Sequence, residues 1–145
     1  MQLSKQEGYA LRLALDLATH DSSSVNDIAA RQNIPAAYLG KIVQSLARAG
    51  VLSTTRGARG GTRLARPAAQ INLRQVIEAA NGPIALSRCL AEPDHDCPTK
   101  TAACPVRQVT MRLQRTVTRE LESVSLEELA SMAHAGGGAA LAGSA

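Results

Sequence analysis

The sequence predicts a mainly α-helical fold that carries one small β-hairpin. Three observations support this class. Apolar residues recur at intervals of three or four over several segments, which is the period of an amphipathic helix. A glycine-rich turn separates two short segments with strand character. The 145 residues are 45% hydrophobic but include no Trp or Phe and only two Tyr, so aliphatic side chains must form the core.

Residues 1–50 contain signals for three helices, over about 4–19, 24–32 and 35–49. Each begins at a residue that favours a helix N-terminus: Ser4, Ser24 and Pro35. Glu7 completes a capping box with Ser4, and Gly50 ends the third helix. The apolar face of the third helix consists of Tyr38, Leu39, Ile42, Val43 and Leu46. Two short helices joined by a tight turn, the second with a basic polar face, indicate a helix-turn-helix.

The next segment predicts a hairpin. Residues 51–55 and 62–65 have strand character, and residues 56–61 (Arg-Gly-Ala-Arg-Gly-Gly) form the turn between them. A hairpin directly after a helix-turn-helix is a wing. Arg56, Arg59 and Arg63 lie at its tip, where the glycines allow the backbone to come close to a partner.

Three further helices are predicted beyond the wing. Asn72 caps one over residues 73–80, Pro105 begins a long one, and Ser125 with Glu128 caps a last one that ends near Met132. The long helix has an apolar stripe formed by Val106, Val109, Leu113, Val117 and Leu121. That stripe predicts pairing with the same helix of a second subunit, or alternatively packing within one chain.

Charge is segregated along the chain. Residues 1–66 hold nine basic and four acidic side chains, and no acidic residue occurs between Asp27 and Glu78. Eight basic residues fall in that gap: Arg31, Lys41, Arg48, Arg56, Arg59, Arg63, Arg66 and Arg74. This pattern indicates a surface that meets nucleic-acid phosphates, with a solubilising basic face as the alternative. The scarcity of aromatic residues argues against modules that stack bases on aromatic platforms.

All three cysteines, Cys89, Cys97 and Cys104, fall within sixteen residues of a proline-punctuated loop. An odd number of cysteines in a chain without a secretory signal argues against a disulfide framework. Clustered thiols suit zinc, an iron–sulfur cluster or redox chemistry, and spacing alone leaves these three open. A fourth ligand would come from His95, from Asp94 or Asp96, or from a carboxylate elsewhere.

Together these segments resemble the bacterial iron–sulfur cluster transcription regulators of the IscR and NsrR type. The likeness covers residues 1 to about 133. Its parts are the opening Met-Gln-Leu-Ser with Tyr-Ala-Leu at 9–11, Tyr-Leu at 38–39, Leu46 with Gly-Val-Leu-Ser at 50–53, the wing Arg-Gly-x-x-Gly-Gly, and three cysteines before a long helix. The resemblance implies a winged helix-turn-helix DNA-binding domain over residues 1–66. It implies a cluster-binding loop with dimerisation helices over 67–134, and we expect a disordered tail over 135–145.

The resemblance also implies roles for particular residues. Cys89, Cys97 and Cys104 match the cluster ligands, and Tyr38 and Arg56 match positions that touch DNA in relatives. Some relatives use a histidine three residues after the last cysteine as fourth ligand, but that position is Arg107, which cannot ligate. Others use a carboxylate from the first helix of the partner subunit, at the position of Gly8. The candidates here are therefore Glu7, which is next to Gly8, His95, or a small exogenous ligand. On the reading helix Lys41, Gln44 and Ser45 are available for DNA contacts.

We therefore expect a cytoplasmic homodimeric repressor that binds a palindromic operator in double-stranded DNA and senses nitric oxide, redox state or iron–sulfur supply. The alternatives are a winged-helix regulator that uses the cysteines for zinc or thiol redox sensing, and an architectural nucleic-acid binder. No apolar run approaches the ~18 residues of a membrane span. His20, His95 and His134 lie in no recognisable catalytic motif, so an enzyme is not expected.

Overall fold

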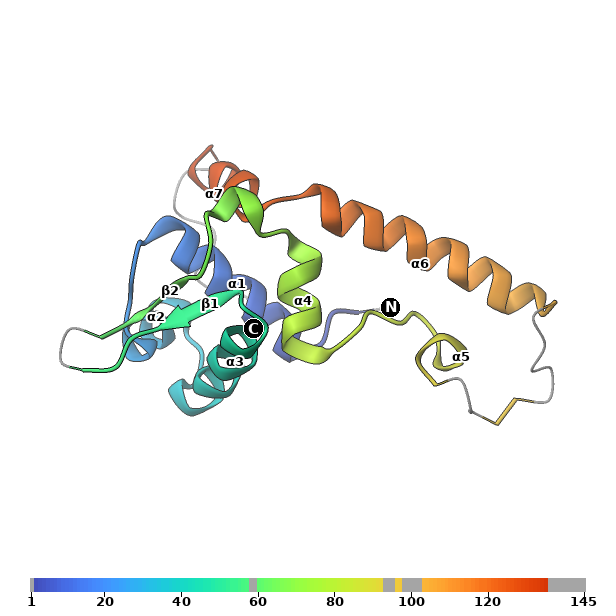
Figure 1. The fold of residues 1–145 in the computed structure, drawn as a ribbon, viewed down its shortest axis with the longest axis horizontal. Helices are drawn as coiled ribbons and strands as arrows, with labels where there is room; N and C mark the ends of the chain where they lie inside the picture. The colour runs from blue at the N-terminus through green and yellow to red at the C-terminus, as the bar shows by residue number, and fades with distance from the viewer. Residues whose placement is uncertain (1, 58–59, 93–95, 98–102, 136–145) are drawn as a thin grey trace.

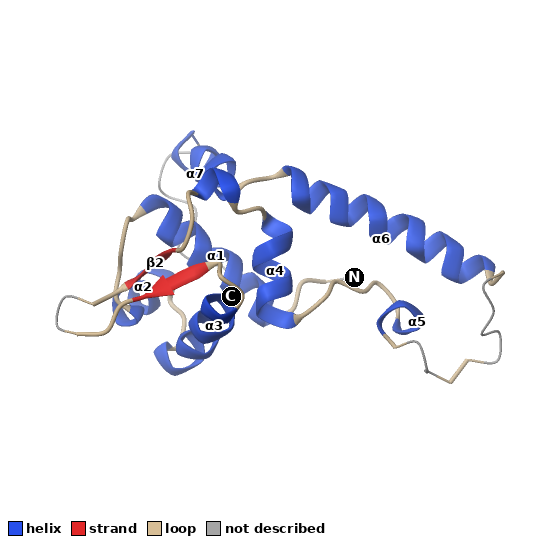
Figure 2. Cartoon of the chain, in the orientation of Figure 1, coloured by secondary structure: helices blue, strands red, loops and turns tan. Residues whose placement is uncertain are grey.

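The computed structural model describes residues 2–57, 60–92, 96–97 and 103–135. These residues are mostly helical, with one two-stranded antiparallel hairpin (Figures 1 and 2). Two parts are visible: a compact part formed by the N-terminal helices, the hairpin, α4 and α7, and an arm formed by α5 and α6. The elements are α1 (Lys5–Thr19), α2 (Val25–Gln32), α3 (Ala36–Arg48), β1 (Leu52–Thr54), β2 (Thr62–Leu64), η1 (Ala68–Gln70), α4 (Leu73–Asn81), α5 (Arg88–Ala91), α6 (Pro105–Ser123) and α7 (Leu126–Ala135).

The predicted helix starts in residues 1–50 are confirmed. Ser4 caps α1 and forms the full capping box with Glu7, and the Ser24 side chain accepts a hydrogen bond from the Asp27 amide at the start of α2. Asn33, in the left-handed conformation with φ 51°, provides the tight turn between α2 and α3. The core beneath these helices includes Leu13, Leu17, Ile28, Leu39, Ile42, Leu46 and Val51, all of which are buried.

The wing follows α3 as predicted. Leu52 pairs with Leu64, Ser53 with Arg63, and Thr54 with Thr62 in antiparallel register. The chain between α1 and α2 adds a single bridge to the hairpin, in which Ser23 and Thr62 exchange backbone hydrogen bonds of 3.0 and 2.8 Å. The orientation of the wing is therefore tied to the helix-turn-helix as well as to its own hairpin.

Helices α4 and α7 pack against α1 and extend the same core. Ile71, Val76, Ala80 and Leu126 are buried in one cluster with the residues of α1 and α3. Asn72 caps α4 with a full capping box, as predicted, and α7 runs three residues beyond the expected end at Met132. The division of the chain at residue 66 stays a prediction. Of the tail predicted over 135–145, Ala135 is the last residue of α7, and 136–145 lie outside the described residues.

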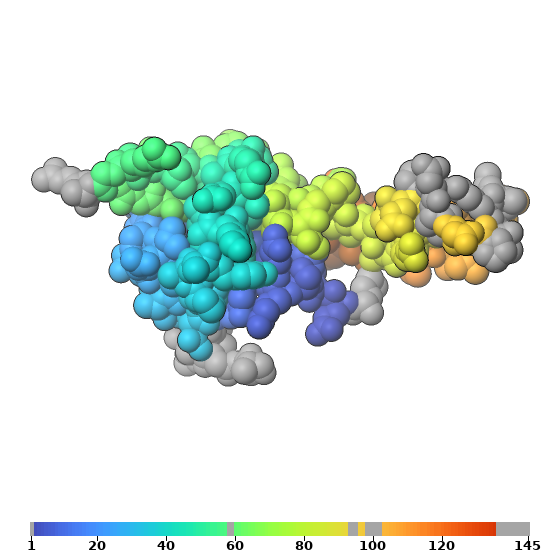
Figure 3. All heavy atoms as spheres, turned by 90° about the horizontal axis from the view of Figure 1, so that it is seen from below, coloured from blue at the N-terminus to red at the C-terminus, as the bar shows by residue number. Residues whose placement is uncertain are grey.

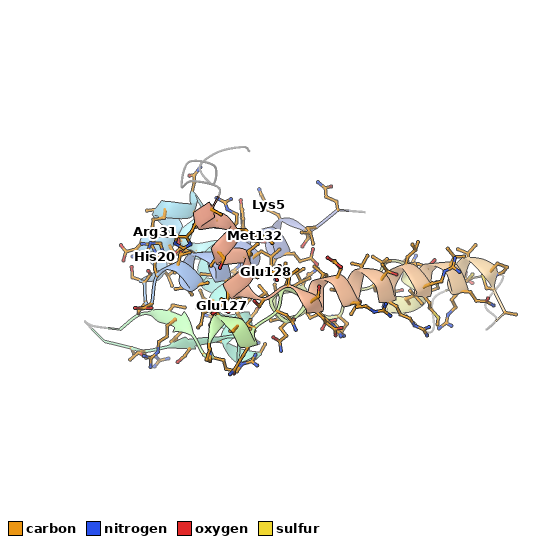
Figure 4. The ribbon with its side chains drawn as sticks, turned by 90° about the horizontal axis from the view of Figure 1, so that it is seen from above. Lys5, His20, Arg31, Glu127, Glu128 and Met132 are labelled. Carbon is orange, nitrogen blue, oxygen red and sulfur yellow. The ribbon has the colours of Figure 1, made fainter. Side chains whose placement is uncertain are left out.

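The arm contains one departure from the sequence prediction. Cys89 was expected in a loop but lies on α5, a single helical turn. The long helix α6 begins at Pro105, as predicted, at the far end of the arm and runs back toward the compact part (Figures 1 and 4). No residue of α6 is buried, and Val106, Val109 and Leu113 are 71%, 47% and 54% exposed. None of the described helices is long and apolar enough to cross a membrane.

Candidate nucleic-acid interface and cysteine segment

The two faces of α3 differ sharply because its apolar residues repeat at helical spacing. One face is buried and consists of Leu39, Ile42, Val43 and Leu46. Lys41, Gln44 and Arg48 are exposed and follow one another at intervals of three and four residues, so they share the opposite face. Ser45 is half-buried beside them. The predicted reading residues are thus on one helix, with Lys41 and Gln44 freely accessible.

Tyr38, near the start of α3, packs against α1. Its ring meets that of Tyr9 edge to face, with centroids 5.7 Å apart and an interplanar angle of 82°. An open hollow lies between the start of α1 and the start of α3, and it is lined by Lys5, Tyr9, Pro35, Ala37, Tyr38 and Lys41. Figure 3 shows the first residues of α1, in dark blue, beside α3, in teal, with the strands of the wing, in green, on the other side of α3.

The wing presents Arg56 and Arg63 to solvent, and Arg59 lies outside the described residues. The turn closes through hydrogen bonds from the Thr55 amide to the Gly61 carbonyl, 2.9 Å, and from the Gly60 amide to the Gly57 carbonyl, 2.8 Å. A Cβ at Gly60 would lie 2.1 Å from the Thr55 carbonyl oxygen, so only glycine fits this turn.

Among the described basic residues of the acid-free gap, two form ion pairs within the protein. Arg31 forms an ion pair with the buried Asp16, and Arg74 pairs with Glu78 and Glu122. Figure 4 shows Arg31 of α2 beside His20 at the end of α1; His20 also contacts Asp16, at 3.6 Å. The distribution of charge along the chain does not reveal these pairs. The Arg31 pair could have been predicted from Asp16, because a carboxylate on the apolar face of α1 needs a partner.

The three cysteines lie on the arm. Cys89 is on α5 with its sulfur 3.1 Å from the Ser87 hydroxyl oxygen, Cys104 is the N-cap of α6, and Cys97 lies between them. Because α5 contacts α6, Cys89 and Cys104 are carried by neighbouring elements. Three thiols in such a segment are the donor chemistry that iron–sulfur clusters and zinc require. Among the residues that the structure describes, no three His, Cys, Asp or Glu side chains gather closely enough to hold a metal ion.

The candidate fourth ligands differ in what the structure shows. His95 lies outside the described residues. Glu7 is engaged at both oxygens: the Ser4 amide donates to Oε2 at 2.6 Å and the Asn81 side chain donates to Oε1 at 3.0 Å. Partial burial raises the pKa of Glu7, but the hydrogen bonds from Ser4 and Asn81 outweigh it and lower the pKa below its ordinary value. Arg107 lies on α6 with Nη1 3.5 Å from the Met111 sulfur.

A winged helix-turn-helix with an exposed basic face on its second helix, joined to a separate arm that carries the cysteines, defines the class of DNA-binding transcription regulators. Comparison with known families agrees: residues 3–132 match the model of the Rrf2 family, described as iron-dependent transcriptional regulators. The chain belongs to the Rrf2 family. The resemblance inferred from the sequence is confirmed, as is the expectation that the protein is a regulator of transcription and not an enzyme.

Individual relatives support the same assignment. The chain is 33% identical over 132 residues to the transcriptional regulator NsrR of Geobacillus kaustophilus, a match that covers 89% of each protein. The structure of CymR, the global cysteine regulator of B. subtilis, is similar with a TM-score of 0.74 and 27% identity, and covers 91% of this chain and 98% of that one. IscR of T. potens has the same fold, with a TM-score of 0.75, 24% identity and coverage of 94% and 91%.

Proposed function

We propose that the chain is a homodimeric repressor that binds a palindromic operator and whose cysteine segment senses nitric oxide, redox state or iron–sulfur supply. The observation that carries the proposal is the placement of the thiols. Cys89 and Cys104 lie on neighbouring elements of an arm whose long helix has an uncovered apolar stripe. A sensor placed at a dimer contact acts on the relative position of the two DNA-binding parts.

The DNA contacts follow from exposure on α3 and on the wing. Lys41 and Gln44 would enter the major groove, with Ser45 and Tyr38 at its edge. Arg56 and Arg63 on the wing, together with Arg59, would bind backbone phosphates or the minor groove. In such an interface the phosphate contacts dominate affinity, which makes binding depend strongly on salt.

Pairing of α6 with its copy explains the exposed stripe. Val106, Val109 and Leu113 are large apolar residues about half exposed or more, and burial of such side chains stabilises association by about 25 cal/mol for each Å² removed from water. A twofold dimer places two reading helices on two half-sites of a palindrome.

Cys89, Cys97 and Cys104 would hold an iron–sulfur cluster, with Glu7 of a second subunit or His95 as fourth ligand. When bound, such a cluster supplies a group that reacts with nitric oxide and oxidants. For Glu7 to ligate, it must first give up its hydrogen bonds to Ser4 and Asn81. That exchange is a physical link between the cysteine segment and the start of α1.

A path from the arm to the reading helix runs through α4. Arg74 of α4 contacts Glu122 near the end of α6, and the other end of α4 holds α1 through the hydrogen bond from Asn81 to Glu7. The start of α1 in turn contacts α3 through Tyr9 and Tyr38. A change in the position of α6 can therefore bias the placement of α3.

The test is to purify the protein without oxygen and measure its visible spectrum with its iron, acid-labile sulfide and zinc content. We expect a coloured protein with iron and sulfide, and we expect Cys97→Ala to abolish the absorbance and alter operator binding. A colourless protein with stoichiometric zinc would contradict cluster sensing, as would unchanged operator binding by Cys97→Ala under every condition.

Thiol sensing without a cluster is the second candidate. The similarity to CymR, the global cysteine regulator of B. subtilis, favours it, and a related structure is that of S. aureus CymR in an oxidized form. In that case the protein contains no metal after reconstitution with iron and sulfide, and oxidant alone changes DNA binding reversibly with added reductant.

A further inference from the structure

We infer that the hollow between α1 and α3 is a binding site for a backbone phosphate of the operator, with Lys5 as the residue that pairs with it. The inference rests on the proposed DNA-binding function and adds to it a contact from α1, a helix outside the reading helix and the wing. The hollow is lined by Lys5 and Tyr9 from α1 and by Pro35, Ala37, Tyr38 and Lys41 from the start of α3.

Lys5 lies beside the aromatic pair formed by Tyr9 and Tyr38. Its Nζ lies 6.0 Å from the centroid of the Tyr9 ring, at the outer limit of a cation–π contact, and Tyr9 is fixed by its edge-to-face contact with Tyr38. The ammonium therefore lies beside the hollow, on an exposed side chain that can reach an anion there.

The charge of the hollow favours an anion. Of the described residues that line it, two are lysines and none is acidic. Glu7, on the same turn of α1 as Lys5, has both carboxylate oxygens bound to Ser4 and Asn81. Arg12 also lies over the Tyr9 ring, 6.0 Å from its centroid, but its guanidinium donates hydrogen bonds to Gln32, so it is not the phosphate ligand.

Duplex DNA is the anion that fits because the hollow shares two residues with the reading helix. Tyr38 and Lys41 line the hollow, and Lys41 is on the exposed face of α3 together with Gln44. The major groove is about 12 Å wide and is bounded by phosphates on both sides, so a helix about as wide as the groove brings its flank against one strand. Insertion of α3 thus brings a phosphate to the hollow at its flank.

The experiment uses the full-length protein and a duplex enriched by the wild type from a randomised 30-bp library, about three helical turns. For Lys5→Gln we expect the slope of log K against log[salt] to fall by about 0.9 for each half-site. Single neutral methylphosphonates placed along the duplex should identify one flanking position. There the wild type loses between about threefold and tenfold in affinity, whereas Lys5→Gln loses none.

Arg119→Gln is the matched control, because Arg119 is an exposed basic residue on α6 far from the hollow. It should leave the slope and the methylphosphonate pattern unchanged, and Lys5→Arg should retain the wild-type slope. An unchanged slope in Lys5→Gln, or equal sensitivity of both proteins to every methylphosphonate, overturns the site. Failure of the wild type to enrich any duplex would instead contradict the proposed function, so the two failures are distinguishable.

Discussion

Asp16 of α1 and Arg31 of α2 form a two-pronged ion pair around a carboxylate that is 1% exposed. Arg31 Nη2 lies 2.6 Å from Oδ1 and Nε lies 3.0 Å from Oδ2, and Gln32 donates a third hydrogen bond of 3.0 Å. The same Nη2 donates to the Ser23 hydroxyl at 2.7 Å, and the Ser23 backbone pairs with Thr62 of the wing. One buried carboxylate therefore connects α1, α2 and the wing.

Replacement of Asp16 by Asn should destabilise the protein. The variant removes the charge that Arg31 requires while leaving the site buried, so we expect the free energy of unfolding to fall by about 2–4 kcal/mol. Urea unfolding followed by circular dichroism at neutral pH measures it. Asp21→Asn, at an exposed position a few residues on, is the control and should change stability by less than about 0.5 kcal/mol. Equal effects of the two variants would contradict the role given to this pair.

The same carboxylate should make stability depend on acid pH. Burial raises the pKa of Asp16, but hydrogen bonds from Arg31 and Gln32 and the charge of Arg31 outweigh it, so the folded pKa is lower than the ordinary value. Because the folded pKa is the lower one, the stabilisation is complete above the unfolded pKa and is lost as pH falls through the folded pKa. The difference in unfolding free energy between the wild type and Asp16→Asn should therefore shrink as the pH falls below the unfolded pKa of Asp, about 3.9, and through the lower folded pKa. A difference that stays constant down to the lowest pH would contradict this.

Local signals allowed much of the fold to be predicted from the sequence. The caps at Ser4, Ser24 and Asn72 and the proline at the start of α6 depend only on neighbouring residues, and the helices begin where these signals are. Long-range pairings could not be predicted in this way, because they depend on tertiary contacts. The sequence placed Arg31 among the basic residues of a surface that meets nucleic acid, whereas in the structure it forms an ion pair with Asp16.

The same distinction between local signals and tertiary contacts applies to the candidate site. The exposed face of α3 followed from its helical period, which placed Lys41 and Gln44 together. The hollow beside it depends on α1 lying against α3, and no sequence signal paired Lys5 with Lys41. The cysteine segment was recognised by its residue types, but the helical turn that carries Cys89 has only four residues, too few for a period to be detected.

Gly60 should be required for the conformation of the wing turn but not for the stability of the core. In Gly60→Ala the new methyl group collides with backbone at Thr55, so the turn must open and carry the neighbouring Arg56 with it. We expect the affinity for the duplex enriched by the wild type to fall at least about tenfold, because more than one phosphate contact is lost. The melting temperature should change little. Gly8→Ala, where a Cβ meets nothing within 4 Å, should preserve the wing and raise stability by up to about 1 kcal/mol. Normal DNA binding by Gly60→Ala would contradict this account of the turn.

Cys104→Ser should distinguish a role of the thiol in metal binding from a role in stabilising the start of α6. Cys104 is the N-cap of α6, but its side chain makes no capping hydrogen bond. Serine favours this position, so the metal-free variant should be as stable as the wild type or more stable by about 0.5–1 kcal/mol. Loss of visible absorbance in this variant would then report lost ligation. A marked fall in melting temperature of the metal-free protein would show that the thiol supports the helix itself.

The apolar stripe of α6 should determine the oligomeric state. Leu113 is 54% exposed, so Leu113→Glu removes few contacts within one chain and should leave its fold intact. In a dimer that pairs α6 with its copy, the same change would bury two carboxylates against apolar surface, at a cost of several kcal/mol. We therefore expect a folded monomer in sedimentation experiments and at least a hundredfold weaker operator binding, a loss of about 2.7 kcal/mol or more.

Gln108→Glu introduces the same charge on another face of α6 and should remain dimeric. A Leu113→Glu variant that sediments as a dimer would place the interface elsewhere, and a wild type that is monomeric at all concentrations would exclude the paired half-site arrangement altogether.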